Sequence, residues 1–152
     1  MTPTDQLVDD FLAASRALVG LAVRSVSASP VEVTLVQYRV LVLVSQGERT
    51  IGEIAVELRV NPSNATRQCD RLQRLGLVER FRSPEDGRVV RVALTAAGEA
   101  VVEAVTARRR EEVRRVLEAM SVDDVEVVVG ALGAFGRAAR ETSEVDWVSV
   151  LG

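Results

Sequence analysis

The stretch NPSNATRQCDRLQRLGLVER, residues 61–80, sets hydrogen-bonding and basic side chains beside one apolar stripe. The apolar residues of positions 61–75 recur three or four apart, as on one face of an α-helix; they are Ala65, Cys69, Leu72 and Leu75. The polar residues that lie off this face are Ser63, Asn64, Thr66, Arg67, Arg71 and Arg74. Such a helix is either an ordinary solvated surface helix or a helix that reads nucleic acid.

The positive charge of the chain is concentrated around this stretch. The whole chain contains 19 basic and 22 acidic residues, for a net charge of −3. Positions 59–91 alone contain eight arginines and four acidic residues, a local net charge of +4, and the other 11 basic and 18 acidic residues carry −7. A basic segment in an acidic protein indicates a local anionic partner.

Composition argues against an enzyme or a metalloprotein. The chain has no histidine and one cysteine, so it lacks the commonest metal ligand and the commonest general base. Its carboxylates form no recognisable catalytic motif, and it has no glycine-rich phosphate loop. We therefore expect no catalytic residues, no metal site and no cofactor.

Membrane insertion and secretion are not expected either. The longest apolar stretch, YRVLVLV, is short and contains Arg39, and the first residues, MTPTDQLVDD, are acidic. A membrane span needs about 20 apolar residues, and a signal peptide begins with basic ones. We expect a cytoplasmic protein without a membrane partner.

Helices are expected on both sides of the basic stretch. Residues 5–26 have an apolar seam that suits packing on another helix, formed by Leu7, Phe11, Ala14, Leu18 and Leu21. Two further helices are expected after the basic stretch, from Thr95 to about Met120 and from Ser121 onward. The inward residues of the last helix are expected to be Val125, Val128, Val129, Leu132 and Phe135.

Shorter helices are expected directly before the basic stretch. Thr34 with Gln37 fits a capping box and starts a helix to Ser45, and Thr50-Ile-Gly-Glu53 starts another to Leu58. The β-branched residues 40–44 are also compatible with a strand, but the length of the segment favours a buried helix.

The helix of the basic stretch is followed by a hairpin. Asn61 is a strong N-cap before Pro62, and Gly76 ends the helix as its first non-helical residue. The period then changes: LVERFRS and RVVRVALT flank the polar turn PEDG, which predicts a β-hairpin.

This order of elements predicts a mainly α fold that contains a winged helix-turn-helix, with dimerisation helices at both ends. The expected divisions are a winged helix-turn-helix domain at 32–95, a helical dimerisation region at 5–27 and 96–142, and a C-terminal tail at 143–152. The long amphipathic helices are too extended for the winged domain to bury alone, so a second copy of the chain is the expected partner.

The sequence resembles the MarR family of bacterial transcriptional regulators. The family pattern Ser-x-x-Thr-Arg and then Leu-x-x-x-Gly-Leu-Val-x-Arg is met by Ser63, Thr66, Arg67, Leu72, Gly76, Leu77, Val78 and Arg80. The wing pattern Asp-x-Arg-x-x-x-Val-x-Leu-Thr is met by Asp86, Arg88, Val92, Leu94 and Thr95. The chain departs from the pattern at Arg59, where the family often has glycine.

The resemblance implies a homodimer that binds a pseudo-palindromic operator in double-stranded DNA, and in most cases a repressor released by a small aromatic effector. The residues implied for the major groove are Pro62, Ser63, Asn64, Thr66, Arg67 and Arg71. The residues implied for the wing are Arg82, Asp86, Gly87 and Arg88, with Asp86 holding the guanidinium of Arg88. An effector pocket is expected at Phe11, Tyr38 and Arg39.

Less specific interpretations remain beside these. The winged helix could instead be a protein–protein interaction module whose basic segment serves solubility. Cys69, on the inner face of its helix, is interpreted as a small core residue.

Overall fold

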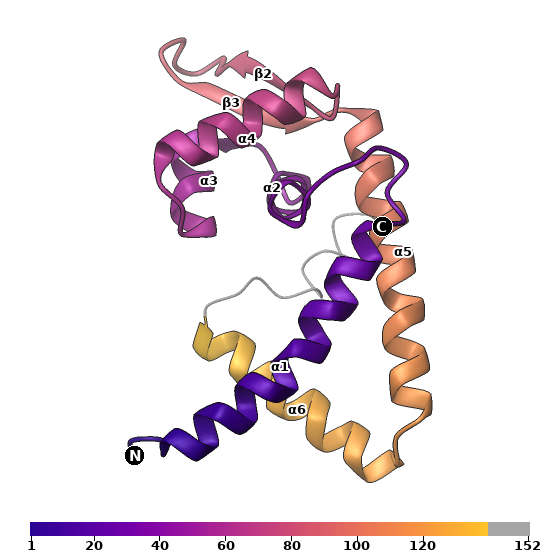
Figure 1. Ribbon diagram of the computed structural model, residues 1–152. Coiled ribbons are helices and arrows are strands. Elements are labelled where there is room, and N and C mark those ends of the chain that lie inside the picture. The colour runs from indigo at the N-terminus through magenta and orange to yellow at the C-terminus, as the bar shows by residue number, and fades with distance from the viewer. Residues whose placement is uncertain (140–152) are drawn as a thin grey trace.

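The computed structural model describes residues 1–139. Figure 1 shows a winged unit, residues 35–94, built from short helices and a small sheet, with three long helices extending away from it. The elements of the winged unit are α2 (Leu35–Ser45), β1 (Arg49–Thr50), α3 (Ile51–Leu58), α4 (Pro62–Arg74), β2 (Val78–Arg82) and β3 (Val90–Leu94). The expected order of helix, turn, helix and hairpin is confirmed.

Reciprocal side-chain bonds start α2 and α3, as predicted. The Thr34 hydroxyl accepts from the Gln37 backbone N–H at 3.2 Å, and the Gln37 side chain accepts from the Thr34 N–H at 2.9 Å. Thr50 and Glu53 form the same box, with bonds of 3.1 and 2.8 Å. The bond from the Thr50 N–H lowers the pKa of the Glu53 carboxyl. Residues 40–44, which are also compatible with a strand, lie in α2.

A tight turn joins α3 to α4. It passes through Arg59, which has φ 54° and ψ 42° and is the only non-glycine residue with positive φ among residues 1–139. The Asn61 side chain then caps α4 by accepting from the Asn64 N–H at 2.7 Å. Gly76, with φ 73°, ends the helix in the left-handed region, where glycine has no Cβ to clash.

The sheet has one more strand than expected. Its order is β1-β3-β2, and both pairings are antiparallel, with Arg80 opposite Val92 and Arg49 also opposite Val92 on the other side. Thr50 is predicted from the sequence only as a helix cap. A two-residue strand shows no alternation of apolar and polar residues, so its pairing depends on the fold and not on a local pattern.

The hydrophobic core lies inside the winged unit and includes the start of α5 (Ala96–Glu118). Completely buried side chains come from each layer, among them Leu41, Ile54, Leu72, Val92 and Val101. The first half of α5 therefore belongs to this core, although the boundary expected at residue 96 assigns the helix to the dimerisation region.

A close contact fixes α5 on the winged unit. Thr95 caps the helix by accepting from the Gly98 N–H at 3.1 Å, and its own N–H donates to the Leu77 carbonyl at 3.1 Å. A Cβ at Gly98 would lie 2.1 Å from the Leu77 carbonyl oxygen. Glycine is therefore required here for the helix and the backbone to approach each other.

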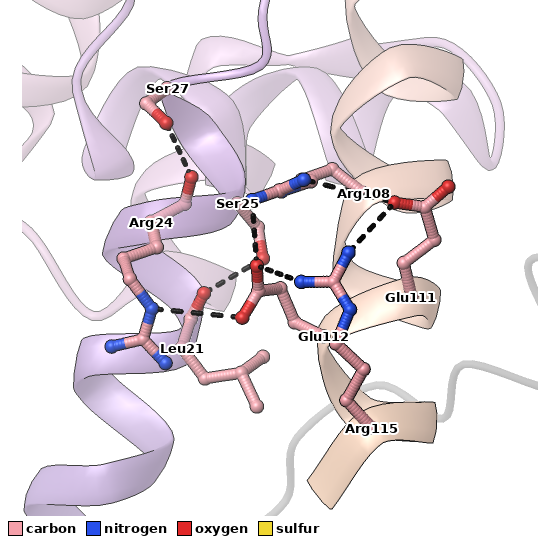
Figure 2. A network of polar contacts seen from close by, with 8 residues as sticks. All are labelled: Leu21, Arg24, Ser25, Ser27, Arg108, Glu111, Glu112 and Arg115. Carbon is pink, nitrogen blue, oxygen red and sulfur yellow. Dashed lines mark hydrogen bonds and ion pairs between the residues drawn. The ribbon is translucent and has the colours of Figure 1, made fainter.

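The second half of α5 holds α1 (Asp5–Val26) through the ion-pair network in Figure 2. Glu112 of α5 has a side chain that is only 13% exposed and lies 3.7 Å from Arg24 of α1. Arg108 and Arg115, on the same face of α5, approach it at 2.8 and 3.4 Å. Arg108 and Arg115 hold the Glu112 carboxylate within α5, and Arg24 is the cation that reaches it from α1.

The helices α1 and α6 (Val122–Ala139) expose apolar faces. Ser121 caps α6, as predicted. None of the described residues of α6 is buried: Val125 and Val128 are half-buried, and Val129, Leu132 and Phe135 are exposed. The inward packing expected of this helix is therefore only partial within one chain. We call the exposed apolar residues of both helices the α1–α6 apolar face: Leu7, Val8, Phe11, Leu12, Leu18, Val19, Val23, Val122, Val127, Val129, Leu132 and Phe135.

The remaining expectations concern membrane insertion, the C-terminal tail and the domain boundaries. No helix within residues 1–139 is both long and apolar enough to cross a membrane. The expected tail at 143–152 and the last three residues of the 96–142 region lie outside the described residues, and the domain boundaries stay predictions.

Candidate nucleic-acid interface

The first turn of α4 is open to solvent. Pro62 and Ser63 are exposed, and the Asn61 cap bonds one of the backbone N–H groups that have no partner at the start of a helix. The helix dipole adds a partial positive charge at this end. The turn can therefore accept a phosphate oxygen, and the Ser63 hydroxyl can donate or accept a hydrogen bond beside it.

Two polar side chains of this turn are held by bonds along the helix. The Thr66 hydroxyl donates to the Pro62 carbonyl at 2.9 Å, and the Asn64 side-chain oxygen accepts from Gln68 at 3.2 Å. Both residues are half-buried. The Asn64 amide nitrogen and the lone pairs of the Thr66 hydroxyl keep further capacity for an external partner.

Two arginines of α4 extend into solvent. Arg67 and Arg71 are exposed, and their side chains make no hydrogen bond or ion pair within the described chain. Arg74 differs, because its Nε donates to the Asp70 carbonyl at 3.4 Å. The opposite side of α4 is completely buried at Ala65, Cys69 and Leu72, so the helix must present the arginines outward.

The wing loop is held by its own side chains. Arg82 donates from Nη1 to the Gly87 carbonyl at 2.6 Å, and Asp86 accepts from the Arg88 backbone N–H at 3.0 Å. Ser83 closes the hairpin by donating its N–H to Val89 at 2.8 Å. The loop is therefore ordered by contacts that leave the Arg88 side chain at its exposed tip.

Asp86 differs in detail from the expectation. Its carboxylate bonds the backbone of Arg88, and no ion pair between the two side chains is found in the described structure. Asp86 thus shapes the turn on which Arg88 sits without fixing the guanidinium. Gly87 has neither a positive φ nor a neighbour that a Cβ would meet, so the turn does not require glycine there.

An ion pair that the sequence analysis missed links α4 to the wing. Arg80 of β2 lies 2.6 Å from the Asp70 carboxylate of α4, and its Nη2 also lies 3.5 Å from the Thr66 carbonyl. In the sequence, Arg80 stands out only as the last residue of the family pattern. Helical or strand spacing could not have found the pair, because its members come from different elements.

Cys69 lies in the core beneath α4, as its spacing indicates. Its side chain is completely buried, and burial raises the pKa of the thiol, an effect that the positive charge of Arg80 partly opposes. A protonated, inaccessible thiol is a poor nucleophile, so this residue serves packing.

The residues expected to line an effector pocket do not come together. The Phe11 ring packs on Phe135 of α6 at 4.7 Å between centroids, whereas the Tyr38 hydroxyl lies 3.3 Å from Thr106 of α5. About 22 Å of helix separates Phe11 from Val26, the part of α1 that packs in the same core as Tyr38. Arg39 is half-buried on α2.

Comparison with known proteins decides which group of winged-helix proteins this geometry belongs to. A model of the MarR family matches residues 32–89. The Bacillus subtilis HTH-type transcriptional regulator YfiV is 30% identical over 108 residues, 70% of this chain and 68% of YfiV. The solved structure of Rv1404 from Mycobacterium tuberculosis superposes with a TM-score of 0.86 at 35% identity and covers 94% of this chain and 98% of that one.

The chain belongs to the MarR family. The resemblance noted in the sequence and the expected fold are confirmed. The B. subtilis HTH-type transcriptional repressor MdtR is a further relative, 28% identical over 82% of this chain and 83% of its own. The names of these relatives agree with the expectation of a regulator and not an enzyme. The matches to two other B. subtilis regulators, YsmB and YhbI, span only 56% and 49% of those proteins.

Proposed function

We propose that this MarR family protein is a transcriptional regulator that binds a pseudo-palindromic operator in double-stranded DNA as a homodimer. The observation that carries the proposal is the pair of arginines, Arg67 on α4 and Arg88 on the wing, that remain exposed and unpaired within the described chain. They lie within residues 59–91, which carry a net charge of +4 in a chain whose overall charge is −3. Such a surface suits a polyanion.

Helix α4 would enter the major groove with its first two turns. Arg67 can bond the O6 and N7 atoms of a guanine together, which distinguishes this base from the others. Ser63, Asn64 and Thr66 would contact neighbouring bases or phosphates, and the backbone N–H groups that follow Pro62 would donate to a phosphate. Arg71, one turn further along the helix, would meet the DNA backbone.

The wing would reach the adjacent minor groove. Strand β2 runs back along α4, since Arg80 contacts Asp70 and Thr66, so the loop after Arg82 returns toward the start of α4. Figure 1 shows this loop and the α3–α4 turn at the same end of the winged unit, away from α5. Arg88 would enter the minor groove, whose narrow A·T-rich forms attract arginine.

A second copy of the chain would cover the α1–α6 apolar face. A monomer rarely exposes so many large apolar side chains along two neighbouring helices. A two-fold dimer would place its two α4 helices about 34 Å apart, one turn of DNA, and would require two similar half-sites.

A small effector could regulate DNA binding by such a dimer. We propose a repressor, as MdtR is named, that releases DNA when a ligand favours a different spacing of the α4 helices. Because Phe11 lies far from Tyr38 in one chain, we propose that the ligand binds in a hollow of about 490 Å³ at the α1–α2 connection. It is lined by residues that include Val26, Ser29, Val33 and Leu35.

Selection of bound duplexes from a random pool tests the proposal. We expect enrichment of a two-fold-symmetric sequence, followed by its release by one member of a panel of small aromatic acids. Binding should weaken linearly with the logarithm of salt concentration, with a slope of about 0.9 per phosphate contact. A protein-interaction module would show neither enrichment nor this salt dependence.

Substitution of Arg67 tests the assignment within the site. Arg67→Ala should weaken operator binding by about 1–3 kcal/mol and relax the preference at one base position, because a bidentate contact is lost. Arg110→Ala, a change of the same charge on exposed α5, is the matched control and should bind normally. Equal loss on all sequences would mean that Arg67 contacts only phosphate.

A further inference from the structure

The contact between Arg80 and α4 joins the two parts of the proposed DNA-binding surface. Arg80 lies in the middle of β2, the strand that leads to the wing loop, and pairs with Asp70 at 2.6 Å. Its Nη2 also approaches the carbonyl of Thr66, one turn earlier on α4. One guanidinium therefore spans two successive turns of the helix on the side that faces the wing.

The surroundings of Arg80 indicate that it serves the fold of this surface and not a direct phosphate contact. Its side chain is 22% exposed, and its Nε is buried without a hydrogen-bond partner in the described structure. Burying an unpaired donor costs free energy, so the position of this side chain must be supported by the pair that it makes. Arg67 and Arg88, by contrast, are exposed.

The inner face of α4 packs in the core through small as well as large side chains. Two of the three completely buried residues on its inner face, Ala65 and Cys69, are small. A small side chain makes fewer contacts than a large one, so less packing energy opposes a small roll of the helix at these two positions than at Leu72. A directional ion pair on the flank of the helix adds a restraint to that of the packing.

We propose that Arg80 is a positioning residue for base reading: through Asp70 it fixes the roll of α4 against the wing strand. Arg67 directly follows Thr66, whose carbonyl lies near Arg80, so a roll of α4 would move the Arg67 guanidinium away from its base. The inference rests on the proposed function, and it assigns the sequence preference, but not the overall affinity for DNA, to this pair.

The substitution Asp70→Asn distinguishes a positioning role of the Arg80–Asp70 pair from a purely electrostatic effect on DNA binding. It removes a negative charge from the DNA-binding surface, so electrostatics alone predicts equal or tighter binding to every duplex. Positioning predicts that the ratio of operator affinity to random-duplex affinity falls about tenfold or more, because a misplaced arginine loses its bidentate contact. Glu79→Gln, the same charge change at an exposed position of β2, is the matched control and should keep the ratio.

Two further variants complete the experiment. Arg80→Ala should also reduce the ratio, and the exchanged pair Asp70→Arg with Arg80→Asp should recover part of it, because the ion pair is rebuilt in the opposite sense. Affinities for the selected operator and for a random duplex would be measured by fluorescence anisotropy, and circular dichroism would establish that each variant is folded. Asp70 is 46% exposed, so Asp70→Asn carries the test if Arg80→Ala does not fold.

The outcomes distinguish the two levels of the proposal. An unchanged ratio in folded Asp70→Asn would overturn the positioning role while leaving DNA binding in place. An equal loss on both duplexes for Arg80→Ala, with a salt slope lower by about 0.9, would identify a phosphate contact and also overturn it. A wild-type protein with no preference for any duplex would overturn the proposed function together with this inference.

Discussion

Arg59 adopts a backbone conformation that most side chains avoid. Its φ of 54° places it in the left-handed region, where the Cβ crowds the neighbouring carbonyl. The strain is offset in part by a hydrogen bond of 3.1 Å from its Nη2 to the Ala139 carbonyl near the end of α6. The residue therefore closes the α3–α4 turn and also links the winged unit to a long helix.

Two substitutions of Arg59 separate these effects. Arg59→Gly removes the strain and should raise the free energy of unfolding by up to about 1 kcal/mol, even though the bond to Ala139 is lost. Arg59→Ala loses the bond but keeps the strain and should be slightly destabilising. Urea unfolding followed by circular dichroism measures both, and a glycine variant less stable than the alanine variant would contradict this account.

The thiol of Cys69 makes the free energy of unfolding depend on pH under alkaline conditions. Burial raises the pKa of its thiol above the ordinary value of 9.0, so the folded chain keeps the proton where the unfolded chain loses it. Stability from this residue is therefore complete below the unfolded pKa and declines as the pH rises above about 9. Cys69→Ala should show a shallower decline than the wild type in urea unfolding between pH 8 and pH 10.

Chemical modification provides an independent check of Cys69. Iodoacetamide should react slowly with the folded protein at pH 8 and rapidly in urea, because only the unfolded thiol is accessible and ionised. Rapid alkylation of the folded protein would show that the thiol is not enclosed beneath α4.

At the level of elements, local sequence signals predicted most of the winged unit. The capping residues Thr34, Thr50, Asn61 and Thr95 mark helix starts because each bonds backbone groups within three residues. The change from helical to alternating period located the hairpin of β2 and β3 in the same way. These features depend on neighbours along the chain, so they can be seen in the sequence.

Contacts between elements could not be predicted in this way. Strand β1 exists because Arg49 and Thr50 meet β3, and the pair of Arg80 with Asp70 exists because β2 returns along α4. The separation of Phe11 from Tyr38 likewise follows from the direction in which α1 leaves the core. The arginines proposed to contact DNA were indicated by their type and spacing together with the resemblance to the family. The residues that contact them from other elements could be identified only from the fold.

The joint between α5 and the winged unit gives a prediction at the same scale. Gly98→Ala places a Cβ against the Leu77 carbonyl oxygen, a rigid backbone group, so α5 must shift. We expect a loss of about 3 kcal/mol in the free energy of unfolding, measured by denaturant titration. Gly130→Ala in α6 has free space around it and should be neutral or slightly stabilising.

At the level of the whole molecule, the α1–α6 apolar face is the surface through which we propose that two copies of the chain associate. Leu18→Glu places a charge within this face and should convert the proposed dimer to a monomer at micromolar concentration, measured by analytical ultracentrifugation. The monomer should also bind the operator far more weakly, because one chain contacts only one half-site.

A second variant of α1 controls for the introduced charge. Ala13→Glu adds the same charge on another side of the helix and should remain dimeric. A dimeric Leu18→Glu protein would show that the two copies meet through a different surface.

Helix α5 leads from the winged unit to α6 as one continuous helix. Its 23 residues extend for about 35 Å, from the joint at Gly98 past the network around Glu112. A tilt of about 10° at the joint would move the far end by about 6 Å, whereas neighbouring base pairs lie about 3.4 Å apart. A ligand bound beside this joint could therefore shift the winged units of a dimer by nearly two base pairs along the DNA, while every helix and strand stays folded.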